Sequence, residues 1–112
     1  MLDLRDKTAI ITGGATGIGF GLAKACGEQG AKVVIGEPRQ ARLDEAVGVL
    51  EAAGVTARAF LLDVTDPEQL ARFTEQAFAA FGEVALVVNN AGIGQARGSV
   101  MDTAFEEMRR VM

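Results

Sequence analysis

The feature that most restricts the fold of this chain is a regular alternation between short apolar runs and segments with helical spacing. The four apolar runs have the length and character of buried strands, and they lie at residues 7–12, 31–36, 57–64 and 84–88. Apolar residues recur every three or four positions between these runs, as in helices that bury one face. Strands covered by helices on both faces form parallel sheets, so the sequence predicts an α/β fold with a doubly wound parallel sheet.

The first helix is expected over residues 17–29, with Gly30 in the left-handed conformation at its end. Cys26 falls in this helix, and its spacing predicts one buried face shared with three apolar neighbours. These neighbours are Ile18, Leu22 and Ala25. We therefore interpret the only cysteine of the chain as a packed side chain rather than a reactive thiol.

The second and third helices have recognisable start and stop residues. The second is expected over residues 40–53, ended by Gly54. Asp66 is expected to cap the third, with Pro67 at its first position and Gln69 placed for a capping box. The predicted inner faces consist of Leu43, Ala46, Val47 and Leu50 in the second helix and of Leu70, Phe73, Ala77 and Phe81 in the third.

After the fourth strand the pattern predicts a loop at residues 92–98 and a further helix that opens at Asp102. This last helix reaches Met112 without a stop signal. We therefore expect the chain to be incomplete at its C-terminus, with residues 1–112 forming part of one domain.

Composition excludes several classes of function. The net charge is −4 and no basic stripe is present, which argues against a nucleic-acid partner. The longest apolar runs are too short to span a bilayer, and no secretory signal precedes the first strand. A single cysteine forms no intrachain disulfide, so we expect a cytoplasmic protein. The absence of histidine removes the commonest metal ligand, and no metal site is predicted.

The turn after the first strand is rich in glycine and leads into a helix, with the sequence T-G-G-A-T-G-I-G at residues 12–19. Glycines let the backbone approach a pyrophosphate, and the helix N-terminus offers free N–H groups to it. The G-x-G-x-x-G pattern fails because Leu22 occupies its last position, whereas G-x-x-x-G-x-G fits Gly13, Gly17 and Gly19. An ordinary strand-to-helix turn is the alternative, and a kinase-type P-loop is excluded because no Gly-Lys-Ser/Thr follows.

Glu37 follows the second strand at close to the spacing of about 20 residues seen in dinucleotide sites. A carboxylate there accepts hydrogen bonds from the adenosine ribose hydroxyls and opposes a 2′-phosphate. The sequence therefore predicts NAD as the cofactor, with NADP less favoured. Arg39 could reach a phosphate from nearby, but the sequence does not show which way Pro38 directs it.

With these pieces in place the chain resembles the short-chain dehydrogenase/reductase family from about Lys7 to its end. The glycine turn is similar to the family's T-G-x-x-x-G-x-G loop, residues 63–66 resemble its D-V turn, and N-N-A-G at residues 89–92 matches a further motif. The resemblance implies the first four strands and flanking helices of a Rossmann-type fold, truncated before its catalytic half.

The resemblance also implies which residues bind the nicotinamide dinucleotide. The pyrophosphate loop would comprise Gly13, Thr16, Gly17, Ile18 and Gly19; Glu37 would hold the ribose; Asp63 and Val64 would face the adenine; and Asn90, Ala91 and Gly92 would lie beside the cofactor. Two structural alternatives stay open: Asn89 ties neighbouring strands together, and Asp63 simply ends its strand.

The family's chemistry uses a Ser and a Tyr-x-x-x-Lys pair, and this chain has no tyrosine, while Ser99 does not match the catalytic serine. No catalytic residue is therefore predicted here. The implied activity is hydride transfer between a nicotinamide cofactor and an alcohol or carbonyl substrate, by a full-length homo-oligomer. The alternatives are a non-catalytic dinucleotide sensor and a methyltransferase, and N-N-A-G together with the glycine spacing disfavours the second.

Overall fold

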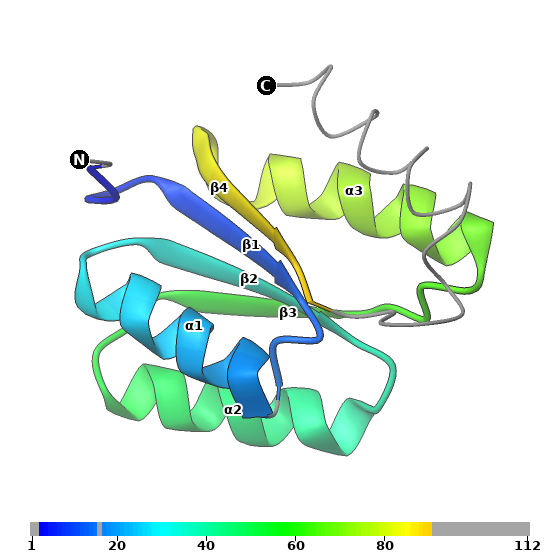
Figure 1. Ribbon diagram of the computed structural model, residues 1–112, viewed down its shortest axis with the longest axis horizontal. Helices are drawn as coiled ribbons and strands as arrows, with labels where there is room; N and C mark the ends of the chain where they lie inside the picture. The colour runs from blue at the N-terminus through cyan, green and yellow to red at the C-terminus, as the bar shows by residue number, and fades with distance from the viewer. Residues whose placement is uncertain (1–2, 16, 91–112) are drawn as a thin grey trace.

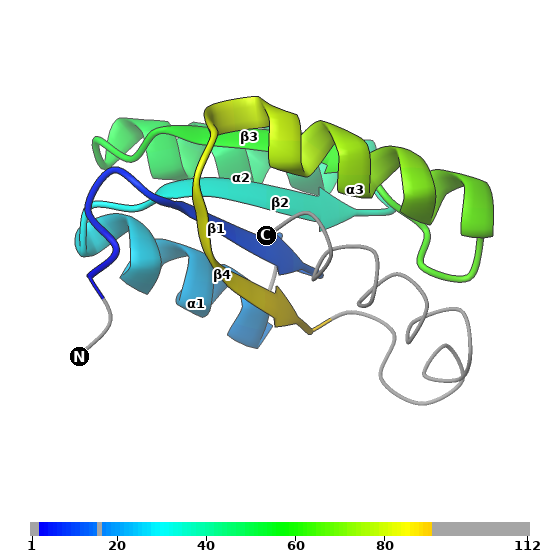
Figure 2. The same ribbon diagram turned by 90° about the horizontal axis from the view of Figure 1, so that it is seen from above.

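The computed structural model describes residues 3–15 and 17–90, which form a parallel sheet between two layers of helices (Figure 1). The strands are β1 (Thr8–Thr12), β2 (Lys32–Glu37), β3 (Ala57–Leu61) and β4 (Val84–Asn89), in the order β3-β2-β1-β4. The helices are α1 (Gly17–Glu28), α2 (Gln40–Ala52) and α3 (Pro67–Phe81). Helices α1 and α2 cover one face of the sheet and α3 the other (Figures 1 and 2), which confirms the predicted doubly wound arrangement.

The core lies in two clusters, one on each face of the sheet. Side chains alternate along β1, so Ala9 and Ile11 pack beneath α1 and α2 while Ile10 packs beneath α3. All three are fully buried, and burial of an isoleucine side chain contributes about 1.5–3 kcal/mol. The apolar runs of the sequence are thus explained by a sheet that is covered on both faces.

The strand order creates a reversal between β1 and β4. The chain runs outward from β1 through β2 to β3, and then crosses to the opposite side of β1 to form β4. In open α/β sheets, ligands bind at the carboxyl ends of the strands beside such a switch point. The residues that follow β1 and β4 therefore flank the favoured position for a ligand.

The predicted buried face of α1 is wrong. The structure buries Gly19, Ala23 and Cys26, whereas the side chain positions of Leu22 and Ala25 are exposed and Ile18 is 77% exposed. The cause is the close approach of α1 to the glycine turn, which places the smallest residues of the helix against the sheet. Cys26 is packed as predicted, and burial raises the pKa of its thiol.

The other helices follow their sequence signals closely. Gly30 and Gly54 have φ angles of 91° and 85°, as expected of residues that end helices in the left-handed region. Six of the eight residues predicted on the inner faces of α2 and α3 are buried in the core clusters and the other two are half-buried. The buried ones are Leu43, Ala46, Leu50, Leu70, Phe73 and Ala77, and the half-buried ones are Val47 and Phe81.

The start of α3 differs in one contact from the predicted capping box. The carboxylate of Asp66 accepts from the backbone N–H groups of Glu68 and Gln69, at 3.0 and 3.4 Å, and so caps the helix as predicted. The side chain of Gln69, however, accepts from the N–H of Asp63 at 2.8 Å and not from that of Asp66. The N–H of Asp66 is already bonded to the carbonyl of Asp63, so the capping box is replaced by a wider turn.

That turn also ends β3 at Leu61, three residues before the predicted end of the strand. The predicted loop at residues 92–98 and the helix from Asp102 lie outside the described residues. Within residues 3–15 and 17–90, no helix has both the length and the hydropathy to cross a membrane. The same part of the chain contains no cluster of side chains suited to holding a metal ion.

Candidate functional site

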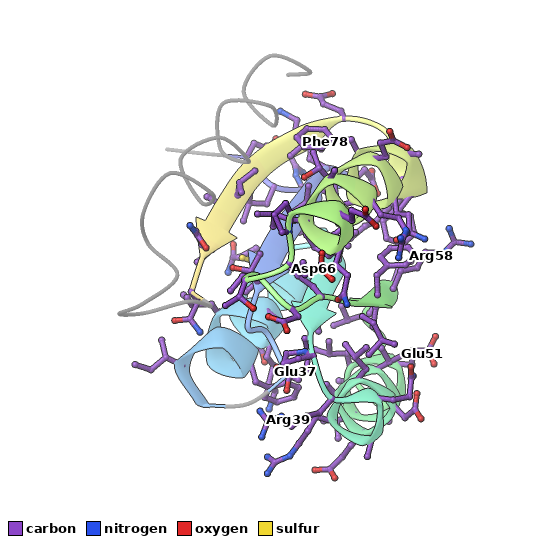
Figure 3. The ribbon with its side chains drawn as sticks, turned by 90° about the vertical axis from the view of Figure 1, so that its right-hand side faces the viewer. Glu37, Arg39, Glu51, Arg58, Asp66 and Phe78 are labelled. Atoms are coloured by element: carbon purple, nitrogen blue, oxygen red, sulfur yellow. The ribbon has the colours of Figure 1, made fainter. Side chains whose placement is uncertain are left out.

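The candidate site is the sheet edge formed by the carboxyl ends of the four strands. Figure 3 looks onto this edge, with Glu37 and Arg39 near the start of α2 and Asp66 at the start of α3. Four of the predicted groups of residues lie along it: the glycine turn after β1, Glu37 at the end of β2, the turn after β3, and Asn90 after β4. The parallel topology alone brings these groups, far apart in sequence, to one edge.

The glycine turn has a backbone that other residues adopt poorly. Gly13 and Gly17 have φ angles of 66° and 60°, in the left-handed region that favours glycine. The N–H of Gly13 donates to the carbonyl of Gly36 at 2.7 Å, which carries the β1–β2 pairing one residue beyond the strand. Thr16, also predicted to bind the cofactor, lies outside the described residues.

Helix α1 begins directly after this turn and is packed tightly against it. A Cβ atom on Gly19 would lie only 2.0 Å from the carbonyl oxygen of Gly13, so the third glycine is required for the close approach. The first turn of α1 contains no acidic residue, which leaves the positive end of the helix uncompensated by a carboxylate of its own. An N-terminus of this kind favours an anion such as a pyrophosphate.

Glu37 ends β2 and is held by an ion pair that the sequence did not predict. Its side chain is only 4% exposed, and its Oε1 accepts from the Nε of Arg39 at 2.6 Å. Arg39 lies at the N-cap position of α2 with extended backbone angles, and its side chain is 56% exposed. The chain around Pro38 therefore directs the Arg39 side chain back toward Glu37. One of the two carboxylate oxygens of Glu37, the residue predicted to bind the ribose, is already paired with the Arg39 guanidinium.

The turn after β3 is organised by Asp63. Its Oδ1 accepts from the backbone N–H and the hydroxyl of Thr65, at 3.0 and 2.6 Å. These two hydrogen bonds lower the pKa of the Asp63 carboxyl below its usual value. Val64, the next residue, is buried in the core beneath α3. Asp63 thus does more than end a strand, because it builds the turn that leads to α3.

The end of β4 is bonded to the end of β1 and to the glycine turn. The hydroxyl of Thr12 donates to Oδ1 of Asn89 at 3.0 Å, which supports the interpretation of Asn89 as a tie between neighbouring strands. The Nδ2 of Asn90 donates to the carbonyl of Gly13 at 3.3 Å. Ala91 and Gly92, the remaining predicted site residues, lie outside the described residues.

Two polar contacts of this edge were not predicted from the sequence, although Gln69 itself was expected at the start of α3. Gln69 accepts from the Asp63 N–H, and Thr65 donates to the Asp63 carboxylate. Asp63 and Thr65 are two residues apart, the spacing at which an Asp side chain bonds its own turn, so that signal was present in the sequence. No comparable signal pointed to the Gln69 contact.

The strand order, the switch point and the glycine turn define a Rossmann-type nucleotide-binding fold. The family model for short chain dehydrogenase matches residues 7–112, and the chain belongs to that family. It is 37% identical over 107 residues to C alpha-dehydrogenase from Sphingobium sp. strain SYK-6, with 96% of this chain and 35% of that protein covered. The crystal structure of LigO in its apo form, from the same strain, has a TM-score of 0.77 at 41% identity, covering 85% of this chain and 36% of that one.

Two other similar structures contain a nicotinamide cofactor. A short chain dehydrogenase/reductase from Burkholderia phymatum, in complex with NAD, has a TM-score of 0.73 at 31% identity, and the match covers 78% of this chain and 31% of that one. Blue fluorescent protein from a metagenomic library, in complex with NADPH, has a TM-score of 0.74 at 36% identity, and the match covers 81% of this chain and 38% of that one. This chain thus spans about a third of each of these four proteins, and its structural neighbours include complexes with both cofactors.

Proposed function

We propose that this chain forms the cofactor-binding part of an NAD(P)-dependent oxidoreductase that transfers a hydride between a nicotinamide and a hydroxyl or carbonyl substrate. Residues 1–112 are proposed to be the dinucleotide-binding half of a single Rossmann domain. One observation carries the proposal: the glycine turn, the buried Glu37 and the Asn90 side chain lie along one sheet edge beside the β1–β4 switch point.

The residues of this edge fit the parts of a dinucleotide. Gly13, Gly17 and Gly19 leave room for close backbone approach at the N-terminus of α1, where a pyrophosphate is favoured. Ile18 lies in the first turn of this helix with its side chain exposed, available to cover the bound dinucleotide. Glu37 is proposed to accept from the ribose hydroxyls through Oε2, since Oε1 is bonded to Arg39.

The adenine is proposed to lie over the turn formed by Asp63 and Val64, and the more distant half of the cofactor beside residues 90–92. Thr16 is proposed to contribute to the pyrophosphate loop. When bound, the nicotinamide supplies the hydride acceptor or donor. The residues of this chain bind and orient it, while the proton of the substrate needs a separate general acid or base.

The family's general acid or base is a tyrosine, and these 112 residues contain none. We therefore propose that the 112-residue chain alone has no dehydrogenase turnover. The same proposal includes an alcohol or carbonyl substrate, a homo-oligomeric full-length protein and a cytoplasmic location, as expected in the sequence analysis.

NAD is proposed as the preferred cofactor because Glu37 presents a carboxylate where NADP would place a 2′-phosphate. Two unit charges 4 Å apart interact by about 4 kcal/mol at an effective dielectric constant of about 20. Arg39 opposes this preference because its guanidinium, 2.6 Å from the carboxylate, offsets the negative charge. With this offset, NAD is proposed to bind at most about tenfold more tightly than NADP, a difference of roughly 1.4 kcal/mol in binding free energy.

Isothermal titration of the purified 112-residue chain with NAD and NADP tests the proposal, together with a turnover assay that mixes the chain, NAD and a panel of alcohols. We expect both cofactors to bind, NAD more tightly, and no NADH to form. Absence of binding by either cofactor would contradict the binding site. Steady NADH formation would contradict the proposed need for residues outside this chain, and tighter NADP binding would reverse the proposed preference.

A further inference from the structure

The carboxylate of Glu37 is covered far more completely than its neighbour at the same sheet edge. Its register partner at the end of β3 is Leu61, which is 50% exposed, whereas Glu37 is 3% exposed. Within the described part of the chain, the only polar contact of this carboxylate is the hydrogen bond from Arg39 Nε to Oε1. The second oxygen, Oε2, accepts no hydrogen bond from the described residues. The proposed acceptor of the ribose hydroxyls is therefore unbonded, yet covered.

The side chain of Arg39 is held at one point and is otherwise open to solvent. It is 56% exposed, and its only hydrogen bond to the described residues is the one to Glu37. It does not cap α2, because the backbone carbonyl of Arg39, and not its guanidinium, accepts from the N–H groups of Arg42 and Leu43. An ion pair with an exposed partner contributes little net stability, since it restrains a side chain with many rotamers. Rotation of the guanidinium away from Glu37 therefore breaks one weak contact and no other.

We propose that Arg39 is a movable cover over Glu37, and that a ribose reaches Oε2 only after the guanidinium has rotated off the carboxylate. This inference rests on the proposed function, since it describes how access to the same site is controlled. The ligand-free chain then exchanges between a covered and an open form, and the apparent affinity for the adenosine end is lowered by the fraction that is open. The opposite role, in which the ion pair holds Glu37 ready for the ribose, predicts weaker binding once Arg39 is removed.

Two uncharged ligands separate the cover from a general effect on the site. Adenosine carries both ribose hydroxyls that are expected to contact Glu37, whereas 2′,3′-dideoxyadenosine lacks them and keeps the base. Because neither ligand is charged, loss of the Arg39 charge does not act on the ligand directly. A variant that uncovers Glu37 changes the affinity for adenosine alone, and a variant that rearranges the sheet edge changes the affinity for both ligands.

The experiment measures the binding of both ligands by NMR titration to the unmodified chain and to Arg39→Ala, Arg39→Met and Arg42→Ala. The methionine variant keeps an unbranched side chain without the charge, in case the alanine variant folds poorly. Arg42 is an exposed arginine in the first turn of α2 with no ion pair to the described residues, so Arg42→Ala is the matched control. Titrations at low and high KCl give a second readout, because salt screens an exposed ion pair and favours the open form.

Both Arg39 variants are expected to bind adenosine about three- to fivefold more tightly, the gain expected when an ion pair of this strength no longer competes. Dideoxyadenosine binding, and adenosine binding by Arg42→Ala, are expected to stay within about twofold of the unmodified chain, because an exposed charge that does not touch Glu37 is screened. High KCl should tighten adenosine binding only where Arg39 is present.

Unchanged or weaker adenosine binding by the Arg39 variants would overturn the cover and leave the proposed function standing. Equal gains for adenosine and dideoxyadenosine, or the same salt response with and without Arg39, would overturn it as well. If the unmodified chain bound neither adenosine nor NAD, both the proposed function and this inference would fail.

Discussion

Replacement of Gly19 by alanine is expected to damage both the fold and the binding site. The new Cβ would lie 2.0 Å from the Gly13 carbonyl oxygen and 2.7 Å from Asn90 Nδ2, while ordinary contacts begin at 3.4 Å. The carbonyl cannot easily turn away, because the N–H of Gly13 is bonded to Gly36. The start of α1 must therefore move by more than an ångström from the turn that it follows.

Overpacking of this kind typically costs about 1–3 kcal/mol. We expect Gly19→Ala to lie at the upper end of that range because one of the two obstructing groups is backbone. For a chain of this size, a loss of about 2 kcal/mol lowers the unfolding midpoint by roughly 10 °C. The displaced helix N-terminus is also expected to bind NAD at least tenfold more weakly, because its N–H groups no longer face the same position.

Gly21→Ala is the matched control, two residues further along the same helix. Apart from its chain neighbours and the backbone of its own helix, no atom of the described residues lies within 4 Å of the Cβ position at Gly21, and the residue is exposed. Alanine is favoured over glycine inside a helix, so this variant is expected to gain about 0.5–1 kcal/mol. The same chemical change should thus have opposite signs at two neighbouring positions.

Urea unfolding followed by circular dichroism measures the two free energies, and titration with NADH measures binding. Equal stabilities of Gly19→Ala and Gly21→Ala would refute the packing argument. A destabilised Gly19→Ala that still bound NADH with normal affinity would refute the link between this contact and the binding site.

Three further outcomes are expected. Glu37→Gln should lower the ratio of NAD to NADP affinity by about tenfold and Arg39→Gln should raise it, since each removes one charge of the 2.6 Å ion pair beside the expected 2′-phosphate. Identical ratios of NAD to NADP affinity in the two variants would show that the charges of Glu37 and Arg39 do not set the cofactor preference. Thr8→Val should raise the free energy of unfolding by about 1 kcal/mol, because Thr8 Oγ1 is buried and has no hydrogen-bond partner among the described residues; a less stable variant would reveal a missed partner. Thr65→Val should raise the pKa of Asp63, whose carboxylate loses the Thr65 hydroxyl. Because folding lowers this pKa, the contribution of Asp63 to stability is present at neutral pH and is lost as the pH falls through the folded value, and an NMR titration of its side chain checks both points.

Much of the fold could be predicted because local rules and long-range packing agree in this chain. The four apolar runs became strands, Asp66 and Pro67 began α3, and Gly30 followed α1 with the expected positive φ angle. The order of strands and helices then placed the predicted site residues at one edge, because parallel strands all end on the same side. These features depend on spacing and residue type, which a sequence displays directly.

The failures concern contacts between side chains whose directions depend on the folded backbone. Periodicity selected Ile18 and Leu22 for the buried face of α1, yet the tight turn before the helix admits only small residues against the sheet. The pairing of Arg39 with Glu37 depends on the backbone angles that surround Pro38. Neither the closeness of α1 to the turn nor the aim of Arg39 is encoded in spacing alone.

The most direct test of the proposed function is a map of the amide resonances of the isotopically labelled 112-residue chain during titration with NAD. We predict the largest shifts at Gly13, Gly14, Gly19 and Glu37, along the carboxyl edge of the sheet, with the amides at the start of the strands unchanged. Shifts confined to the outer face of α2, or no shifts at saturating NAD, would contradict the proposal that this edge binds the dinucleotide.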